Sequence, residues 1–62
     1  MVTKRELTGT RVEFQVSGND VEGDVALLTA AADWLKAHPS MCLVGIALVP
    51  VDRATELHIY VE

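Results

Sequence analysis

Few residues of this 62-residue chain are of the types that carry out chemistry, and none of them falls at a catalytic spacing. Cys42 is the only cysteine and has no partner at CxxC spacing. Apolar neighbours raise the pKa of a thiol and hide its thiolate, so the sequence favours a buried structural cysteine over a nucleophile. His38 lies near enough in sequence to pair with Cys42, but no third residue that would orient the pair is identifiable.

The two histidines and nine acidic residues form no metal-binding pattern. A zinc site takes three or four convergent ligands, and the clustered spacing that supplies them does not occur. The acidic pair Glu22 and Asp24 is explained by the positive end of a helix dipole, and the four glycines match no phosphate-binding loop. We therefore expect no catalytic residue, no metal, no cofactor and no enzymatic activity.

Composition narrows the class of protein further. Half of the residues are hydrophobic, which excludes a disordered chain, and 62 residues allow one domain at most. The five basic residues are too dispersed to follow a nucleic-acid backbone, and the longest apolar run, 41–51, is too short to span a bilayer. With no apolar run after the N-terminal residues and one cysteine, we expect an acidic cytoplasmic protein without a signal peptide.

Three segments have strand patterns. Residues 11–16 and 56–62 alternate polar and apolar side chains, which predicts half-buried strands, and residues 41–49 are apolar on both faces. The inward residues predicted for the two alternating strands are Val12, Phe14, Val16, Leu57, Ile59 and Val61. Residues 1–7 are mostly polar and are expected to fray.

Residues 20–38 are expected to form a helix that Asn19 or Asp20 caps and Pro39 ends. Its apolar side chains cover about half of the circumference, more than the ~100° of a minimal core stripe. The central stripe consists of Val21, Val25, Leu28, Ala32 and Leu35, and Leu27, Ala31 and Trp34 widen it on one side. Gly23 weakens the first turn, by up to ~1 kcal/mol relative to alanine.

These elements predict an α+β fold over residues 1–62, with one helix packed on a three-stranded antiparallel sheet. A right-handed crossover makes the first two strands parallel, so the third can lie between them in the order 1-3-2; the alternative order is 1-2-3. The hairpin is expected to close on a turn at Asp52 and Arg53. The expected cross-strand pairs are Leu48 with Leu57, Ile46 with Ile59, Val44 with Val61, Ala47 with His58, and Gly45 with Tyr60.

The outward face of residues 41–49 is the predicted interaction surface. Leu43, Ala47 and Val49 would lie beside His58 and Tyr60 as an exposed apolar strip, and such strips mark interfaces. Trp34, at the edge of the helix stripe, is either a core residue or a binding anchor. Since a domain of this size buries only ~60% of its unfolded surface, we expect a homo-oligomer, built from dimers if larger than a dimer.

The expected function is therefore that of a small non-enzymatic binding or accessory protein acting through protein–protein association. Very short acidic proteins of this kind include phage-encoded modulators of host proteins. The alternative is a small-ligand-binding oligomer, with a pocket between protomers lined by Trp34 or Tyr60.

Overall fold

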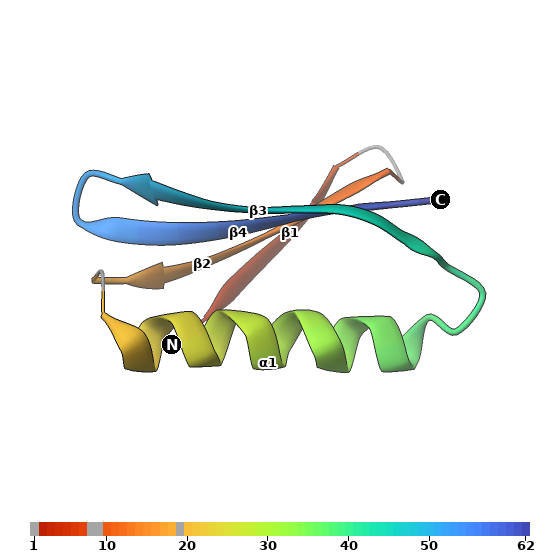
Figure 1. Cartoon of the computed structure of the whole chain (residues 1–62), viewed down its shortest axis with the longest axis horizontal. Coiled ribbons are helices and arrows are strands. Elements are labelled where there is room, and N and C mark those ends of the chain that lie inside the picture. Colours follow the sequence, from red (N-terminus) through yellow and green to blue (C-terminus); the bar gives the residue numbers. More distant parts are fainter. Residues whose placement is uncertain (1, 8–9, 19) are drawn as a thin grey trace.

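The computed structural model describes residues 2–7, 10–18 and 20–62, which form four strands and one helix. The strands form one antiparallel sheet in the order β1-β2-β4-β3. Helix α1 packs against one face of this sheet (Figure 1). In chain order the elements are β1 (Thr3–Leu7), β2 (Arg11–Ser17), α1 (Val21–Ala37), β3 (Leu43–Val51) and β4 (Ala54–Val61).

The prediction of three strands is wrong, because Thr3–Leu7 forms the edge strand β1 instead of fraying; residue 1 lies outside the described residues. β1 pairs with β2 and places Arg5 opposite Glu13. Four of its five residues are polar and it is held by backbone pairing and ion pairs, so no apolar alternation indicates it. The three predicted strands are β2, β3 and β4, and the central position of β4 among them confirms the order 1-3-2 over the alternative.

Helix α1 begins and ends as the sequence predicts. Asp20 is its N-cap, and the side chain accepts a hydrogen bond of 2.7 Å from the backbone N–H of Gly23. The C-cap is His38, whose backbone N–H donates to the carbonyl of Leu35. Asn19, the other predicted cap, lies outside the described residues. The capped helix is long enough to run along most of the sheet (Figure 1).

The β3–β4 hairpin has the predicted register except near its open end. Confirmed are the pairs Leu48–Leu57, Ile46–Ile59, Ala47–His58 and Gly45–Tyr60. Val61 lies opposite Leu43 and not Val44, because a bulge interrupts the register between Leu43 and Gly45. The predicted turn is present, with Asp52 in the left-handed region at φ 53°.

The core lies between α1 and the strands β2 and β4. The six inward residues predicted for the two alternating strands are all buried. From α1, the buried apolar residues are Leu27, Ala31 and Trp34, which the sequence placed at one side of the apolar arc. The central stripe of the helix, which the sequence predicts to face the core, is instead largely exposed. The complete core consists of Val12, Phe14, Val16, Leu27, Ala31, Trp34, Leu57, Ile59 and Val61.

Candidate association surface

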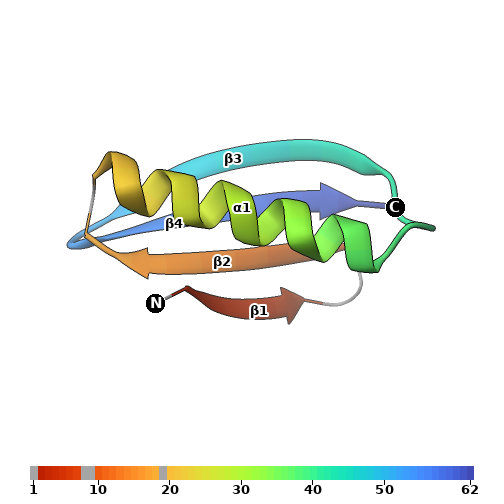
Figure 2. The ribbon, with the colours of Figure 1, turned by 90° about the horizontal axis from the view of Figure 1, so that it is seen from below.

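The sheet is wider than the helix that covers it. Four strands lie ~4.8 Å apart, whereas a helix with its side chains is ~10–12 Å across and covers about two strands. α1 packs mainly on β2 and β4. Figure 2 shows β3 beyond the helix at one edge of the sheet and β1 at the other. The helix-facing side of β3 is therefore left open.

The residues on this side of β3 are apolar and exposed. Val44 is 57% exposed, Ile46 55% and Leu48 48%. The sequence placed all three in the core, because their strand is apolar on both faces and Ile46 and Leu48 pair with buried residues of β4. That inference is wrong because β3 is an edge strand that the helix does not reach over.

The adjacent flank of α1 is also apolar and exposed. Ala30, Asp33 and Ala37 line a hollow together with Lys4 of β1, so they lie on the β1 side of the helix. Leu28 lies about 160° around the helix from Ala30 at ~3.6 residues per turn, which places it on the flank toward β3. It is 45% exposed.

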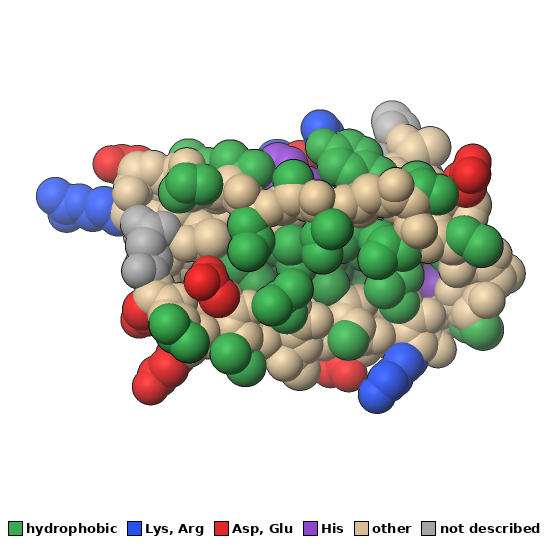
Figure 3. Space-filling model, viewed as in Figure 1, with side chains coloured by type: hydrophobic (Ala, Val, Ile, Leu, Met, Phe, Trp, Pro, Cys, Tyr) green, Lys and Arg blue, Asp and Glu red, His purple; other side chains and the backbone are tan. Residues whose placement is uncertain are grey.

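We call these residues of β3 and α1 the β3–α1 surface. Figure 3 shows apolar side chains in a continuous area between the β3 backbone and the helix. It consists of Leu28, Val44, Ile46 and Leu48.

The two edges of the sheet differ in charge. Three of the five residues of β1 are charged, namely Lys4, Arg5 and Glu6, and charge is a common means by which natural sheets prevent edge pairing. None of the nine residues of β3 is charged. Pro50 is the one residue of this strand that lacks a backbone N–H. β3 thus lacks the charged side chains that protect the edge strand β1.

The opposite face of the sheet carries a polar network centred on Glu13, which is only 8% exposed. Glu13 Oε1 lies 2.6 Å from Arg5 Nη2, and Glu13 Oε2 lies 3.3 Å from Arg11 Nε. His58 Nε2 lies 2.8 Å from Glu56 Oε1 and 3.9 Å from Glu13 Oε2. Among the described residues, every buried side-chain nitrogen or oxygen has a hydrogen-bond partner.

This network resembles a metal site only in its donor types. One ligand atom from each of Glu13, Glu56 and His58 lies within 4.8 Å of the other two. Two arginines already neutralise Glu13, however, and a cation would have to displace them. The geometry is therefore that of an ion-pair network that holds β1, β2 and β4 together.

The ion pairs and hydrogen bonds of β1 also shift the pKa values of three groups that form them. The hydrogen bond and charge of Arg5 lower the pKa of Glu13, and Glu13 raises the pKa of Arg5. On the helix side of β1, hydrogen bonds from Lys4 and Trp34 lower the pKa of Glu6; the Trp34 bond, Nε1 to Oε2, is 3.2 Å long. β1 is consequently anchored through both of its faces.

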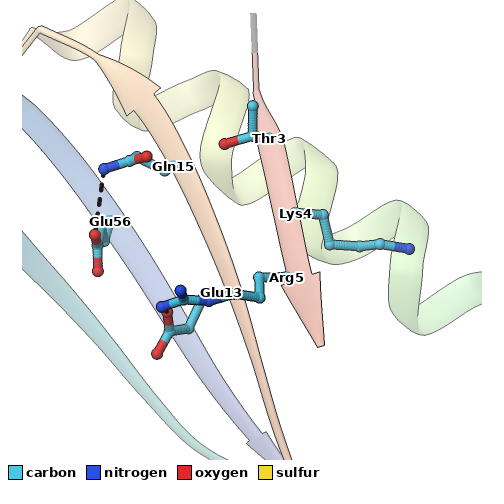
Figure 4. Close-up of a pocket in the computed structure, with 6 residues that line it drawn as sticks. All are labelled: Thr3, Lys4, Arg5, Glu13, Gln15 and Glu56. Atoms are coloured by element: carbon cyan, nitrogen blue, oxygen red, sulfur yellow. Dashed lines mark hydrogen bonds and ion pairs between the residues drawn. The ribbon is translucent and has the colours of Figure 1, made fainter. Parts of the chain in front are cut away.

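A shallow hollow of about 290 Å³ lies over the polar network. In Figure 4, Gln15 donates to Glu56 and Arg5 reaches over Glu13, whereas Lys4 points away from the other labelled residues. Because Arg5 is already paired, a ligand in this hollow would have to break an existing ion pair.

The six predicted interface residues lie in three different places. Leu43 is exposed next to the bulge, and because it lies opposite the buried Val61 it is on the helix-facing side of β3, so its predicted place on the outward face is wrong. Ala47 and Val49 are partly buried on the face opposite the helix. His58 belongs to the polar network. Tyr60 is 36% exposed, and its ring packs over Gly45.

Trp34, the sixth, is a core residue that is 7% exposed, so a single chain does not present it as an anchor. Sequence reasoning placed Val44, Ile46, Leu48 and Leu28 in the core and so missed them as surface residues. One helix covers only about two strands, so the exposure of an apolar edge strand could have been expected once the number of strands was known.

The candidate catalytic pair is not assembled as a buried dyad. Cys42 is exposed, contrary to the buried thiol that the sequence predicts, because it adjoins the edge strand β3. The ring of His38 stacks on Trp34 with centroids 4.0 Å apart, and His38 Nδ1 lies 2.8 Å from the carbonyl oxygen of Trp34. The imidazole is therefore held against the last turn of α1.

Comparison of the chain with protein-family models, with curated protein sequences and with solved structures gives no match. In the part of the chain that the structure describes, no helix has both the length and the apolar character needed to cross a bilayer.

Proposed function

We propose that this chain is a non-enzymatic protein-association module that works as a homo-oligomer, with a dimer as its unit. The observation that supports this is the β3–α1 surface, where four large apolar side chains from two elements are exposed, in the area where Figure 3 shows apolar side chains between β3 and the helix. Contiguous exposed apolar areas of this kind mark sites of protein association.

The free energy available from this surface is of the same order as the cost of forming a dimer. Fully burying a Val, Leu or Ile side chain contributes ~1.5–3 kcal/mol, so a half-exposed one still offers about 1 kcal/mol. In a symmetric dimer each of the four occurs twice, giving about 8 kcal/mol. The cost of association is ~4–15 kcal/mol, which places the dimer within the accessible range.

Sedimentation equilibrium at micromolar concentration tests this proposal. The wild-type chain should sediment at twice its mass of 6.7 kDa. Leu28→Glu should give the monomer, because it places a charge in a desolvated interface, where it costs several kcal/mol. The matched control is Thr29→Glu, the next residue on α1 and also exposed, which should leave the dimer intact. A wild-type species of 6.7 kDa contradicts the proposal.

A second candidate function, small-ligand binding, has one observation in its favour. A hollow of about 400 Å³ lies between β1 and the C-terminal half of α1, with Phe14 and Trp34 among its lining residues and Lys4 and Asp33 supplying charge. Its size falls in the ~300–1,000 Å³ range of ligand pockets. A bound small molecule should raise the Tm and quench Trp34 fluorescence, and Ala37→Trp should abolish both effects by filling the hollow. A compound library that moves neither signal argues against this candidate.

A further inference from the structure

The open edge of β3 carries backbone groups that another strand can use. Cys42 and Glu62 exchange two backbone hydrogen bonds, of 2.8 and 3.0 Å, so Glu62 turns its N–H and C=O toward β3. Successive residues of a strand turn these groups to alternate sides, so Tyr60 and His58 also face β3, opposite Gly45 and Ala47.

By the same alternation, Ile46 and Leu48 turn their N–H and C=O groups to the open edge. Pro50 follows in the same outward series, where its missing N–H costs the sheet no internal hydrogen bond. The open edge thus offers two adjacent donor–acceptor residues, bounded by a bulge near Val44 on one side and by Pro50 on the other.

We infer that a second copy of this chain occupies this edge, with the two β3 strands paired antiparallel about a twofold axis at Ala47. This inference rests on the self-association proposed above and specifies its geometry. Ile46 then lies opposite the partner's Leu48, and each donates its N–H to the other's carbonyl. The twofold axis repeats the pair, which gives four hydrogen bonds.

Neighbouring registers are poorer. Moving the axis to Leu48 sets Ile46 opposite the partner's Pro50, which has no N–H to donate. Moving it to Ile46 sets Leu48 opposite the partner's Val44, at the bulge. The register with its axis at Leu48 also reaches four bonds, two of them between the Leu48 residues on the axis, but only the axis at Ala47 keeps Pro50 and the bulge out of those four bonds.

Side chains agree with this register on both faces. On the helix-facing side, Ile46 and the partner's Leu48 become cross-strand neighbours, so the exposed apolar row continues from one copy into the next. On the other side, Ala47 meets the partner's Ala47 in a non-hydrogen-bonded pair, where Cα atoms are only ~4.5 Å apart and small side chains fit. A twofold axis perpendicular to the sheet places both helices on the same face of eight strands.

Area and charge also favour a second copy. β3 runs for nine residues, or ~30 Å, along a molecule 33 Å long. The side that carries it measures 33 Å by 16 to 18 Å, roughly 550 Å² in projection, which is about two-thirds of the ~800 Å² per partner of a standard interface. Although each chain has a net charge of −4, β3 has no charged residue, so like charges do not meet at the axis.

Cysteine crosslinking tests the register directly. In a Cys42→Ser background, Ala47→Cys should form a disulfide-linked dimer almost completely under mild oxidation, because the expected Cα separation of ~4.5 Å lies within the ~4.4–6.8 Å of disulfides. Val49→Cys is the matched control on the same face of β3, with similar partial burial. Its two sulfurs would be about 13 Å apart along the paired strands, so it should stay monomeric on a non-reducing gel.

Amide hydrogen exchange of the wild-type chain gives a second readout. The amides of Ile46 and Leu48 should exchange at least about tenfold more slowly when the protein is concentrated into the dimer range, whereas that of Ala47, bonded within the hairpin, should not change. If the chain is a dimer but Val49→Cys crosslinks as well as Ala47→Cys, or the Ile46 and Leu48 amides show no concentration dependence, this geometry is wrong and self-association stands. A monomer by sedimentation overturns both.

Discussion

Glu13 is a carboxylate that lies almost fully enclosed on the face of the sheet opposite α1. The guanidinium of Arg5 contacts it from β1, and Arg11 pairs with it from the start of β2. Removing Arg5 alone would leave a charge with little solvent, which is costly, whereas the paired charge is tolerated. The ion pair therefore ties β1, which has few apolar contacts, to the rest of the sheet.

The pH dependence of stability should report this pair. The hydrogen bond from Arg5 lowers the pKa of Glu13 in the folded state. Ionised Glu13 therefore contributes fully to folding stability above pH 4.5, the ordinary pKa of a glutamate, and this contribution is lost as the pH falls through the lowered pKa. The urea midpoint should fall as the pH decreases below about 4.5, and Glu13→Gln should flatten part of that fall. Glu22→Gln, at an exposed site, is the control, and it should show the same fall of the urea midpoint as the wild-type chain. An equally steep fall in Glu13→Gln would contradict this account.

At the scale of elements, the start of α1 depends on close packing against β2. A Cβ on Gly23 would lie 3.1 Å from Asp20 Oδ1 and 3.1 Å from Val16 Cγ1. The first atom is the cap that accepts the Gly23 N–H, and the second belongs to the core. The glycine that the sequence marks as a weak point in the helix is thus the residue that allows the helix to dock.

We predict that Gly23→Ala lowers the free energy of unfolding, although alanine is favoured by ~1 kcal/mol in an exposed helix interior. Asp20→Ala should also lower it, by ~1 kcal/mol, through loss of the cap. Because Asp20→Ala removes one of the two crowding atoms, the double variant should lose less than the sum of the two single losses. Urea denaturation of the four proteins measures this coupling. Gly23→Ala more stable than wild type would contradict the packing argument.

How much of the fold could be predicted depends on whether an element has a local pattern. The alternation in β2 and β4 and the capping and stop signals of α1 are local, and pairing of the larger apolar residues predicted most of the hairpin register. β1 could not be found in this way, because four of its five residues are polar and its anchor, Glu13, looks like an ordinary outward residue of β2.

The candidate surface shows the same limit. The sequence predicts that β3 is apolar on both faces, but whether a helix covers one of them depends on the number of strands and on where the helix lies. The wide apolar arc of α1 fits several rotations about its axis, and the packing against β2 and β4 selects the one that buries Leu27 and exposes Leu28. Burial on this chain is thus a property of the assembled sheet and helix.

At the scale of the whole molecule, the exposed surface is consistent with a protomer. A folded monomer of 6.7 kDa is expected to expose ~3,900 Å², and this chain exposes 4160 Å². The excess is small, but its apolar part is concentrated on the helix-facing side of β3 and the adjacent flank of α1. A chain of 62 residues that leaves these side chains in water forgoes a large part of its available stability.

If self-association stabilises the fold, thermal stability must depend on protein concentration. A tenfold increase changes the free energy of a dimer by about 1.4 kcal/mol, or about 0.7 kcal/mol per chain, and a domain of this size gains ~4–8 °C per kcal/mol. The Tm of the wild-type chain should therefore rise by about 3–6 °C for each tenfold increase, measured by circular dichroism over two decades of concentration. Ile46→Glu should have a Tm that does not change with concentration, because it disrupts the β3–α1 surface, whereas Thr29→Glu should keep the wild-type slope. A constant Tm for the wild-type chain would show that it folds and functions as a monomer, with the exposed row of β3 left in water.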